Sequence, residues 1–355
     1  MEQQLIKKWF QKCIFFMLLT LFFIFALVWI VDPYFHFHRP FSFIKYRLYE
    51  ERYINDGIGR NFDYDAIITG TSMAQNYKVS ELNELFNVNA VKMTFSGAGY
   101  KEISDNIDRA LTRNPGVKKV FYSMDYNGFI REKDWTEYEN YPTYLYDDNP
   151  FNDVSYVFNK DILFHGVLTN VVMTLSGSES TTMDEYSSFV RPTGIEHLMQ
   201  YSDRYDINED IPSYLYEYDY NLLVENIDQN IVQLASKYPD VEFYIFYPPY
   251  SICYWDKLFM DSGSLRQFQA EEKVAEMLLE CPNIKLYNFN NQYDIITDMD
   301  NYSDREHFTA DINSLVLQWL NEGTGLINKD NYLLRLEEEI DYYTNYDYDS
   351  VYNFE

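Results

Sequence analysis

The alternation of apolar and polar positions predicts a parallel β-sheet covered by helices. From Asp63 onward, short and nearly continuous apolar runs alternate with longer segments whose apolar residues recur with helical spacing. The runs typical of strands buried on both faces are 65–69, 90–95, 119–124, 241–247 and 284–289. The segments with a helical period are 79–86, 102–112, 220–237, 265–279 and 310–321. This pattern predicts an α/β fold with a doubly wound, mainly parallel, five-stranded sheet.

One long stretch interrupts this pattern. Residues 131–219 are rich in Tyr, Asp, Asn and Ser, and within them only 160–175 has the pattern of a helix. We expect an insertion between the third and fourth strands that borders the functional site. The expected division is a cytoplasmic tail at 1–12, a transmembrane helix at 13–31, a stalk at 32–62, the α/β domain at 63–130 and 220–325, the insertion at 131–219, and an acidic C-terminal tail at 326–355 with one charged helix at 332–342.

The N-terminal apolar run indicates a membrane anchor. Residues 13–31 carry no charge and approach the roughly 20 residues needed to cross a bilayer. Lys7, Lys8 and Lys12 precede the run and Asp32 follows it, which predicts a cytoplasmic N-terminus and an extracellular main domain. A cleaved signal peptide is the alternative, but the run ends in bulky residues that do not suit a cleavage site. We therefore expect a single-pass protein of a bacterial cell membrane.

The formal net charge of −28 restricts the possible partners. Nucleic acids and anionic lipid headgroups bind basic surfaces, so we expect neither at the exported domain. Aromatic residues make up 19% of the chain, and many tyrosines lie in acidic stretches such as 141–156 and 214–220. Such stretches can form platforms for sugars or a solvated acidic surface, and both interpretations stay open.

Candidate catalytic residues follow the predicted strands. The carboxyl ends of parallel strands meet at one edge of a sheet, where open α/β proteins bind their ligands. Ser72 follows the first strand, where its hydroxyl could act as a nucleophile or cap the next helix. Asp304 and His307 are three residues apart, so the carboxylate can hold one imidazole tautomer and leave the other nitrogen as a general base. Gly97 and Asn127 follow the second and third strands.

This ordered set resembles the SGNH (GDSL-like) hydrolase superfamily. In that family a Ser after the first strand is the nucleophile, a Gly and an Asn after the next two strands supply oxyanion donors, and a D-x-x-H segment precedes the last helix. The resemblance implies Ser72 in GTSMAQN as nucleophile, His307 as base and Asp304 as its orienting partner. It also implies an oxyanion hole formed by the Ser72 backbone N–H, Gly97 in FSGAGY and Asn127 in MDYNGF. The resemblance covers about residues 63–321.

Two motifs depart from the family pattern. The nucleophile block contains G-T-S where the family commonly has G-D-S, and the third block contains D-Y-N-G in place of G-x-N-D. Asp125 therefore competes with Asn127 for the third position, although a carboxylate could stabilise an oxyanion only when protonated.

A more distant similarity concerns membrane-anchored, SGNH-like proteins of cell-envelope acylation, such as those of teichoic acid D-alanylation and alginate O-acetylation. It implies that an envelope glycopolymer or its acyl donor is the substrate and that a multi-pass membrane acyltransferase is a partner. The leading hypothesis is a serine acyl-ester enzyme, either an esterase or an O-acyltransferase, acting on an envelope polysaccharide or teichoic acid. The alternative is a non-catalytic scaffold that binds the glycopolymer or the acyltransferase.

The sequence predicts neither a metal nor a cofactor. Asp298, Asp300 and Asp304 have the spacing of calcium ligands, but Tyr302 occupies a ligand position and the required glycine turn is missing. The remaining histidines, at positions 36, 38, 165 and 197, have no mutual spacing that suggests a ligand set.

Overall fold

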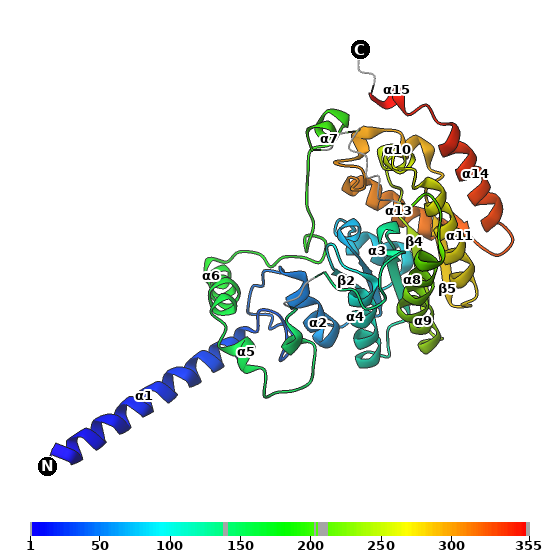
Figure 1. Cartoon of the computed structure of the whole chain (residues 1–355). Coiled ribbons are helices and arrows are strands. Elements are labelled where there is room, and N and C mark those ends of the chain that lie inside the picture. The colour runs from blue at the N-terminus through cyan, green and yellow to red at the C-terminus, as the bar shows by residue number, and fades with distance from the viewer. Residues whose placement is uncertain (1, 138–140, 202–203, 205–211, 353–355) are drawn as a thin grey trace. The chain divides into compact units, whose positions relative to one another are not determined.

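The computed structural model describes residues 2–137, 141–201, 204 and 212–352. Two compact units make up the chain (Figure 1). The membrane-proximal unit combines Met1–Phe62 with Asn140–Thr182, and the α/β unit combines Asp63–Glu139 with Met183–Glu355. The segment expected to form a stalk therefore shares a unit with residues 140–182 of the expected insertion, whereas residues 131–139 and 183–219 of that insertion belong to the α/β unit.

The α/β unit is built on a six-stranded sheet. Its strands are β1 (Ala66–Gly70), β2 (Ala90–Thr94), β3 (Lys119–Ser123), β4 (Glu242–Tyr247), β5 (Ile284–Asn288) and β6 (Leu326–Ile327), in the order β2-β1-β3-β4-β5-β6. The first five strands are parallel, and β6 pairs antiparallel with β5. Nearly every position of β1 to β5 is buried, as expected for strands covered on both faces. The predicted α/β fold with a mainly parallel sheet is confirmed, whereas the predicted number of five strands is wrong. β6 has only two residues, too few to produce a periodic pattern.

Helices cover this sheet near the predicted positions. They are α3 (Val79–Phe86), α4 (Tyr100–Arg113), α8 (Glu217–Ile227), η5 (Asp228–Val232), α9 (Gln233–Lys237), α11 (Ser264–Leu279) and α13 (Ala310–Glu322). The predicted helix at 220–237 is thus one helical segment with a π-helical centre. Shorter or unpredicted elements are η1 (Ser72–Ala74), η2 (Tyr126–Gly128), α7 (Ile195–Tyr201), α10 (Ile252–Met260), α12 (Tyr293–Ile296), η6 (Met299–Asn301) and α15 (Asp349–Tyr352). The helix predicted at 332–342 is α14 (Tyr332–Asn345).

The C-terminal helix α14 is packed onto the α/β unit. The ring of Tyr343 stacks on Trp255 of α10 with centroids 4.1 Å apart, and its hydroxyl donates to the Asn290 carbonyl at 2.6 Å. Glu339 is also buried. The charged helix predicted at 332–342 is present, but it is anchored by Tyr343 and Glu339, whose burial no sequence pattern indicates.

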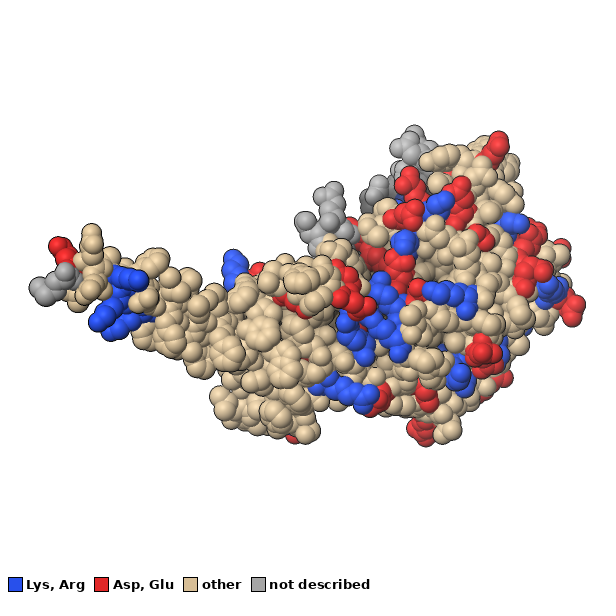
Figure 2. Space-filling view, turned by 90° about the horizontal axis from the view of Figure 1, so that it is seen from below, with Lys and Arg blue, Asp and Glu red and all other residues tan. Residues whose placement is uncertain are grey.

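The membrane-proximal unit begins with the long helix α1 (Glu2–Val31). Its length and composition suffice to cross a membrane, with a mean hydropathy of 3.0 over 18 residues. Figure 2 shows its body free of charged side chains and a basic cluster near its N-terminus, where Lys7, Lys8 and Lys12 lie. The other elements of this unit are α2 (Glu51–Asn61), η3 (Thr143–Leu145), α5 (Val154–Val157), η4 (Ile162–Val167) and α6 (Leu168–Ser176).

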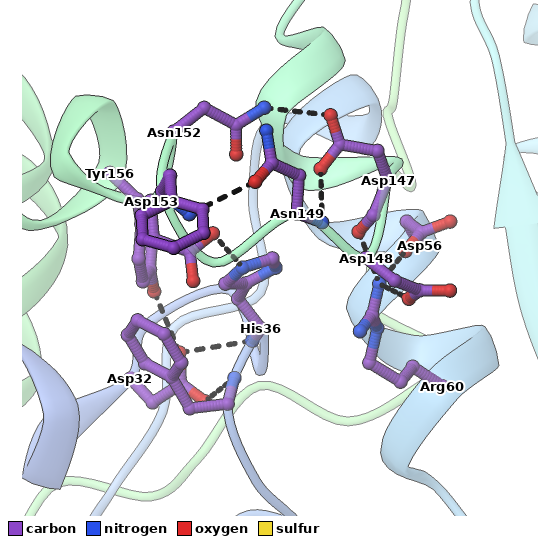
Figure 3. Close-up of polar contacts among 12 residues, drawn as sticks. Asp32, His36, Asp56, Arg60, Asp147, Asp148, Asn149, Asn152, Asp153 and Tyr156 are labelled. Atoms are coloured by element: carbon purple, nitrogen blue, oxygen red, sulfur yellow. Dashed lines mark hydrogen bonds and ion pairs between the residues drawn. The ribbon is translucent and has the colours of Figure 1, made fainter.

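Asp32 fixes the end of α1 within this unit (Figure 3). Its buried carboxylate accepts the backbone N–H groups of His36, Phe37 and His38 at 3.0, 2.7 and 3.0 Å. It also accepts the hydroxyl of Tyr156 on α5 at 2.8 Å. Because four donors satisfy this buried charge, the residue that the sequence presented as a flanking charge is a structural anchor.

Candidate active site

A glycine places the candidate nucleophile at the carboxyl edge of the sheet. Gly70 ends β1 with φ of +150°. A Cβ at this position would lie 2.8 Å from the carbonyl oxygen of Ser123 and 2.9 Å from the Cβ of Ala74. Only glycine fits this close approach, and the turn it permits leads directly to Ser72 at the start of η1.

The capping role at this turn belongs to Thr71. Its side-chain oxygen accepts the backbone N–H of Met73 at 3.4 Å, and its hydroxyl donates to the buried carboxylate of Asp125. From the sequence alone, Ser72 could either cap the helix or serve as a nucleophile. Because its neighbour is the cap, the Ser72 hydroxyl is available for another partner.

That partner is His307, and the three residues of the predicted triad are connected. Ser72 Oγ lies 2.8 Å from His307 Nε2, although 235 residues separate the two in the chain. His307 Nδ1 lies 2.8 and 3.0 Å from the carboxylate oxygens of Asp304. Since a carboxylate can only accept, Nδ1 carries the proton, and Nε2 is left to accept the Ser72 O–H. The fold thus brings together Ser72 and His307, which follow different strands in the sequence.

Asp304 is held as an anion. Burial by itself raises the pKa of this carboxyl, but hydrogen bonds from the His307 ring and from the backbone N–H groups of His307 and Glu306 lower it to about 2. Arg191 adds a contact of 3.3 Å to the same carboxylate and lies over the ring of Phe189. Phe189 in turn packs edge-on against His307, with centroids 5.8 Å apart. Arg191 and Phe189 lie in the expected insertion, and no sequence motif identified them.

The side chains of Asn127 and Asp125, the two candidates for the third oxyanion position, have different surroundings. Asp125 is buried, accepts hydrogen bonds from Thr71 and from Tyr250 at 3.0 Å, and has its pKa raised to about 6 by burial. Asn127, on η2, is exposed and donates its amide to the Glu306 carboxylate at 2.9 Å. Asn127 therefore lies beside the His307 segment, whereas the Asp125 carboxylate is already occupied inside the protein.

Gly97 follows β2, which neighbours β1 in the sheet. It is exposed, with φ of +68°, and among the residues that the structure describes a Cβ built there would meet only the Glu137 side chain, at 4.0 Å. Because a hydrogen bond from Phe95 N–H to the Gly70 carbonyl joins the two strand ends, Gly97 and Ser72 belong to the same edge of the sheet.

Lys92 supports the segment that follows Ser72. This lysine of β2 is buried, and its ammonium donates to the carbonyls of Gln75, Tyr77 and Asp184 at 2.6, 3.1 and 3.2 Å. These bonds connect the turn after Ser72 to the sheet and to the chain that leads toward Arg191.

A cavity of about 640 Å³ adjoins Asp304 and His307, a volume typical of small-molecule sites. Its walls include Arg191, His197, Leu198, Asp304, Glu306 and His307. The wall thus carries charged side chains of both signs beside His307. Among the residues that the structure describes, no group of three or more His, Cys, Asp or Glu side chains is arranged to hold a metal ion.

Comparisons with known proteins assign no family. No protein-family model and no curated protein sequence matches the chain. One solved structure, from Streptococcus pneumonia and provisionally described as a platelet activating factor, is 12% identical with a TM-score of 0.38. That match covers 77% of this chain and 90% of the other. A likeness this slight does not assign a function, so the chemistry has to be inferred from the geometry of the site.

Proposed function

We propose that this chain is an exported, membrane-anchored serine acyl-ester enzyme of SGNH type that acts on a cell-envelope polysaccharide or teichoic acid. The observation that carries the proposal is the unbroken hydrogen-bond chain from Ser72 Oγ through the two ring nitrogens of His307 to Asp304. A nucleophile, a base and an orienting carboxylate in this arrangement constitute the machinery of acyl transfer.

The mechanism follows from the positions of the protons. His307 Nε2 accepts the Ser72 proton as Oγ attacks the ester carbonyl, and it then passes that proton to the leaving alcohol. The ionised Asp304 stabilises the imidazolium that forms in between. The resulting acyl-enzyme is released by water, giving an esterase, or by a sugar hydroxyl, giving an O-acyltransferase. The acceptor depends on how the cavity excludes water, which the triad does not determine.

The oxyanion is assigned to three donors: the backbone N–H groups of Ser72 and Gly97 and the side-chain amide of Asn127. Asn127 donates to Glu306 in the absence of substrate, so its amide has to exchange that carboxylate for the oxyanion during catalysis. Two parts of the proposal remain. The extracellular orientation of the α/β unit rests on the basic flank of α1, and the multi-pass membrane acyltransferase as partner rests on the resemblance.

The test is covalent labelling by a fluorophosphonate probe, which reacts with activated serines. We expect the folded wild-type protein to gain one adduct on Ser72, and Ser72→Ala and heat-unfolded protein to gain none. Absence of labelling in the folded wild type, or equal labelling of Ser72→Ala, would refute the enzyme.

The scaffold alternative keeps one specific observation in its favour. The amide assigned to the oxyanion hole is already occupied by Glu306, and the surrounding D-Y-N-G block departs from the family pattern. A scaffold would show no labelling, and its binding to envelope glycopolymer would be unchanged by Ser72→Ala.

A further inference from the structure

The membrane-proximal unit exposes an apolar surface outside the long helix α1. On the continuous helical segment formed by η4 and α6, the side chains of Phe164, Leu168, Val172 and Leu175 are between 49% and 83% exposed. Their spacing of four, four and three residues places them on one face of the helix.

The segment before this helix extends the surface. Phe151, Val154 and Phe158 are 86%, 58% and 47% exposed. Single exposed apolar residues are ordinary, but seven large ones within 25 residues mark an interaction surface. We call the surface formed by these seven residues the apolar shelf.

The apolar shelf is joined to the end of α1. The Asp32 carboxylate accepts the Tyr156 hydroxyl of α5, and the same hydroxyl accepts the Tyr34 backbone N–H at 3.2 Å. A Cβ on Gly166 would come within 2.9 Å of the Pro33 ring, so η4 contacts the residue that follows Asp32. Figure 1 shows α5 and α6 beside the C-terminal end of α1. In Figure 2 the surface adjoining that end of the helix is largely uncharged.

The residues around this end of α1 have the composition of a membrane interface. Trp29 packs edge-on against His38, and Phe41 stacks on the exposed Phe43. Among these side chains, Trp29 is of the type that gathers at the headgroup level of bilayers. The helical segment 162–176 contains no Lys, Arg, Asp or Glu, so this part of the apolar shelf can enter that layer without desolvating a charge of its own.

We propose that the apolar shelf lies in the outer interfacial layer of the bilayer that α1 crosses, as a second membrane contact of the same unit. The occupant is lipid because the shelf continues the apolar surface of a helix that itself has the length and hydropathy of a membrane span. The contact is apolar and needs no basic residues, so it is compatible with the acidic charge of the chain. The inference rests on the anchoring part of the proposed function and is independent of catalysis.

The experiment uses the full-length protein in zwitterionic phosphatidylcholine vesicles. In a Cys13→Ser background, where Cys253 and Cys281 are buried, single cysteines replace Leu168 or Leu175 and carry a fluorescent label. The matched control is Glu322→Cys, at an exposed position on α13 of the α/β unit.

We expect nitroxide-bearing lipids to quench the labels at 168 and 175 several-fold more than the label at 322, and a water-soluble quencher to show the opposite order. Equal quenching at all three positions would overturn the proposal. Shielding from the aqueous quencher without quenching by the lipid would also overturn it, because a second copy or another protein would then cover the shelf. Fluorophosphonate labelling of the same samples reports the catalytic proposal separately.

Discussion

Ser72 and Asp304 contribute to the proposed reaction in different ways, which makes their variants distinguishable. Ser72→Ala removes the nucleophile, and we expect ester hydrolysis to fall by about 10⁴-fold or more. Asp304→Asn keeps the shape but loses the charge that holds the His307 tautomer, for an expected loss of about 10²–10⁴-fold. Both are measured as kcat/KM on a small aryl ester.

The control for these variants is a truncation in the core. Ile67 is fully buried in β1, and Ile67→Ala should lower the free energy of unfolding by roughly 2–5 kcal/mol. The two site variants should unfold thermally close to the wild type. If Ser72→Ala and Asp304→Asn both kept full activity and unfolded like the wild type, the enzyme hypothesis would fail and the scaffold hypothesis would remain.

A second prediction concerns the oxyanion donors. Asn127→Ala should lower kcat by about 10²–10³-fold with little effect on KM, because its amide acts only on the charge of the transition state. Asp125→Asn should mainly lower the melting temperature, since the buried carboxylate accepts hydrogen bonds from Thr71 and Tyr250. If Asn127→Ala were as active as the wild type, another donor would have to hold the oxyanion.

Single site residues could be predicted from the sequence where they lie next to a recognisable strand or helix. Residues that join the site through long-range contacts could not. Ser72, Asp304 and His307 could be found because each follows a recognisable strand or precedes a recognisable helix. Arg191 could not, because it reaches Asp304 across 113 residues from a segment without periodicity. The contact between Asn127 and Glu306, 179 residues apart, was equally invisible.

Among the elements, continuous apolar runs identified β1 to β5 because buried parallel strands need apolar residues on both faces. Such a signal does not exist for β6, which is held by a backbone hydrogen bond from Asn288 N–H to the Gly325 carbonyl. Helix α10 was missed for a different reason. Its residues 252–256 are all buried, so no polar face reveals a helical period.

The pairing of α11 with α14 creates a pH-sensitive joint. Glu271 of α11 and Glu339 of α14 are both buried, and the Asn288 amide donates to them at 2.6 and 2.9 Å. Burial raises the pKa of Glu339 to about 8, although the hydrogen bond from Asn288 and the charge of Arg335 act in the opposite direction. Burial also raises the pKa of Glu271.

This arrangement predicts that the protein loses stability as the pH rises. Below about 4.5, the ordinary pKa, a carboxyl is protonated in both folded and unfolded chains. Between that value and about 8, only the folded chain retains the proton on Glu339, so unfolding releases it and becomes easier as the pH rises. The melting temperature should therefore fall between pH 5 and pH 8.5, and Glu339→Gln should reduce that fall.

The control is Glu337→Gln, at an exposed position on the same helix, which should leave the pH dependence as it is in the wild type. An identical pH dependence in wild type and Glu339→Gln would show that the carboxyl pair does not retain a proton on folding.

The proposed orientation of the whole molecule can be tested with cysteines in intact cells. Because three lysines precede the apolar part of α1, a membrane-impermeant maleimide should label Glu322→Cys and should reach Gln3→Cys only after permeabilisation. A buried residue such as Tyr250 would not report the orientation, because it is protected from a protease on either side of the membrane. Labelling in the reverse order would place the α/β unit in the cytoplasm.

Because the two units alternate along the chain, they become able to fold at different times during synthesis. The membrane-proximal unit needs residues up to Thr182, and the sheet needs strands synthesised both before Asn140 and after Thr182. During synthesis, β1 to β3 therefore emerge early and have to wait for β4, which pairs with β3. In that state the unpaired strand edges are open to misassembly. Ribosome-stalled chains ending near residue 220 should thus protect the membrane-proximal unit from protease while leaving 63–139 susceptible. Protection of both segments at that length would show that the first three strands form a stable body before the rest of the sheet exists.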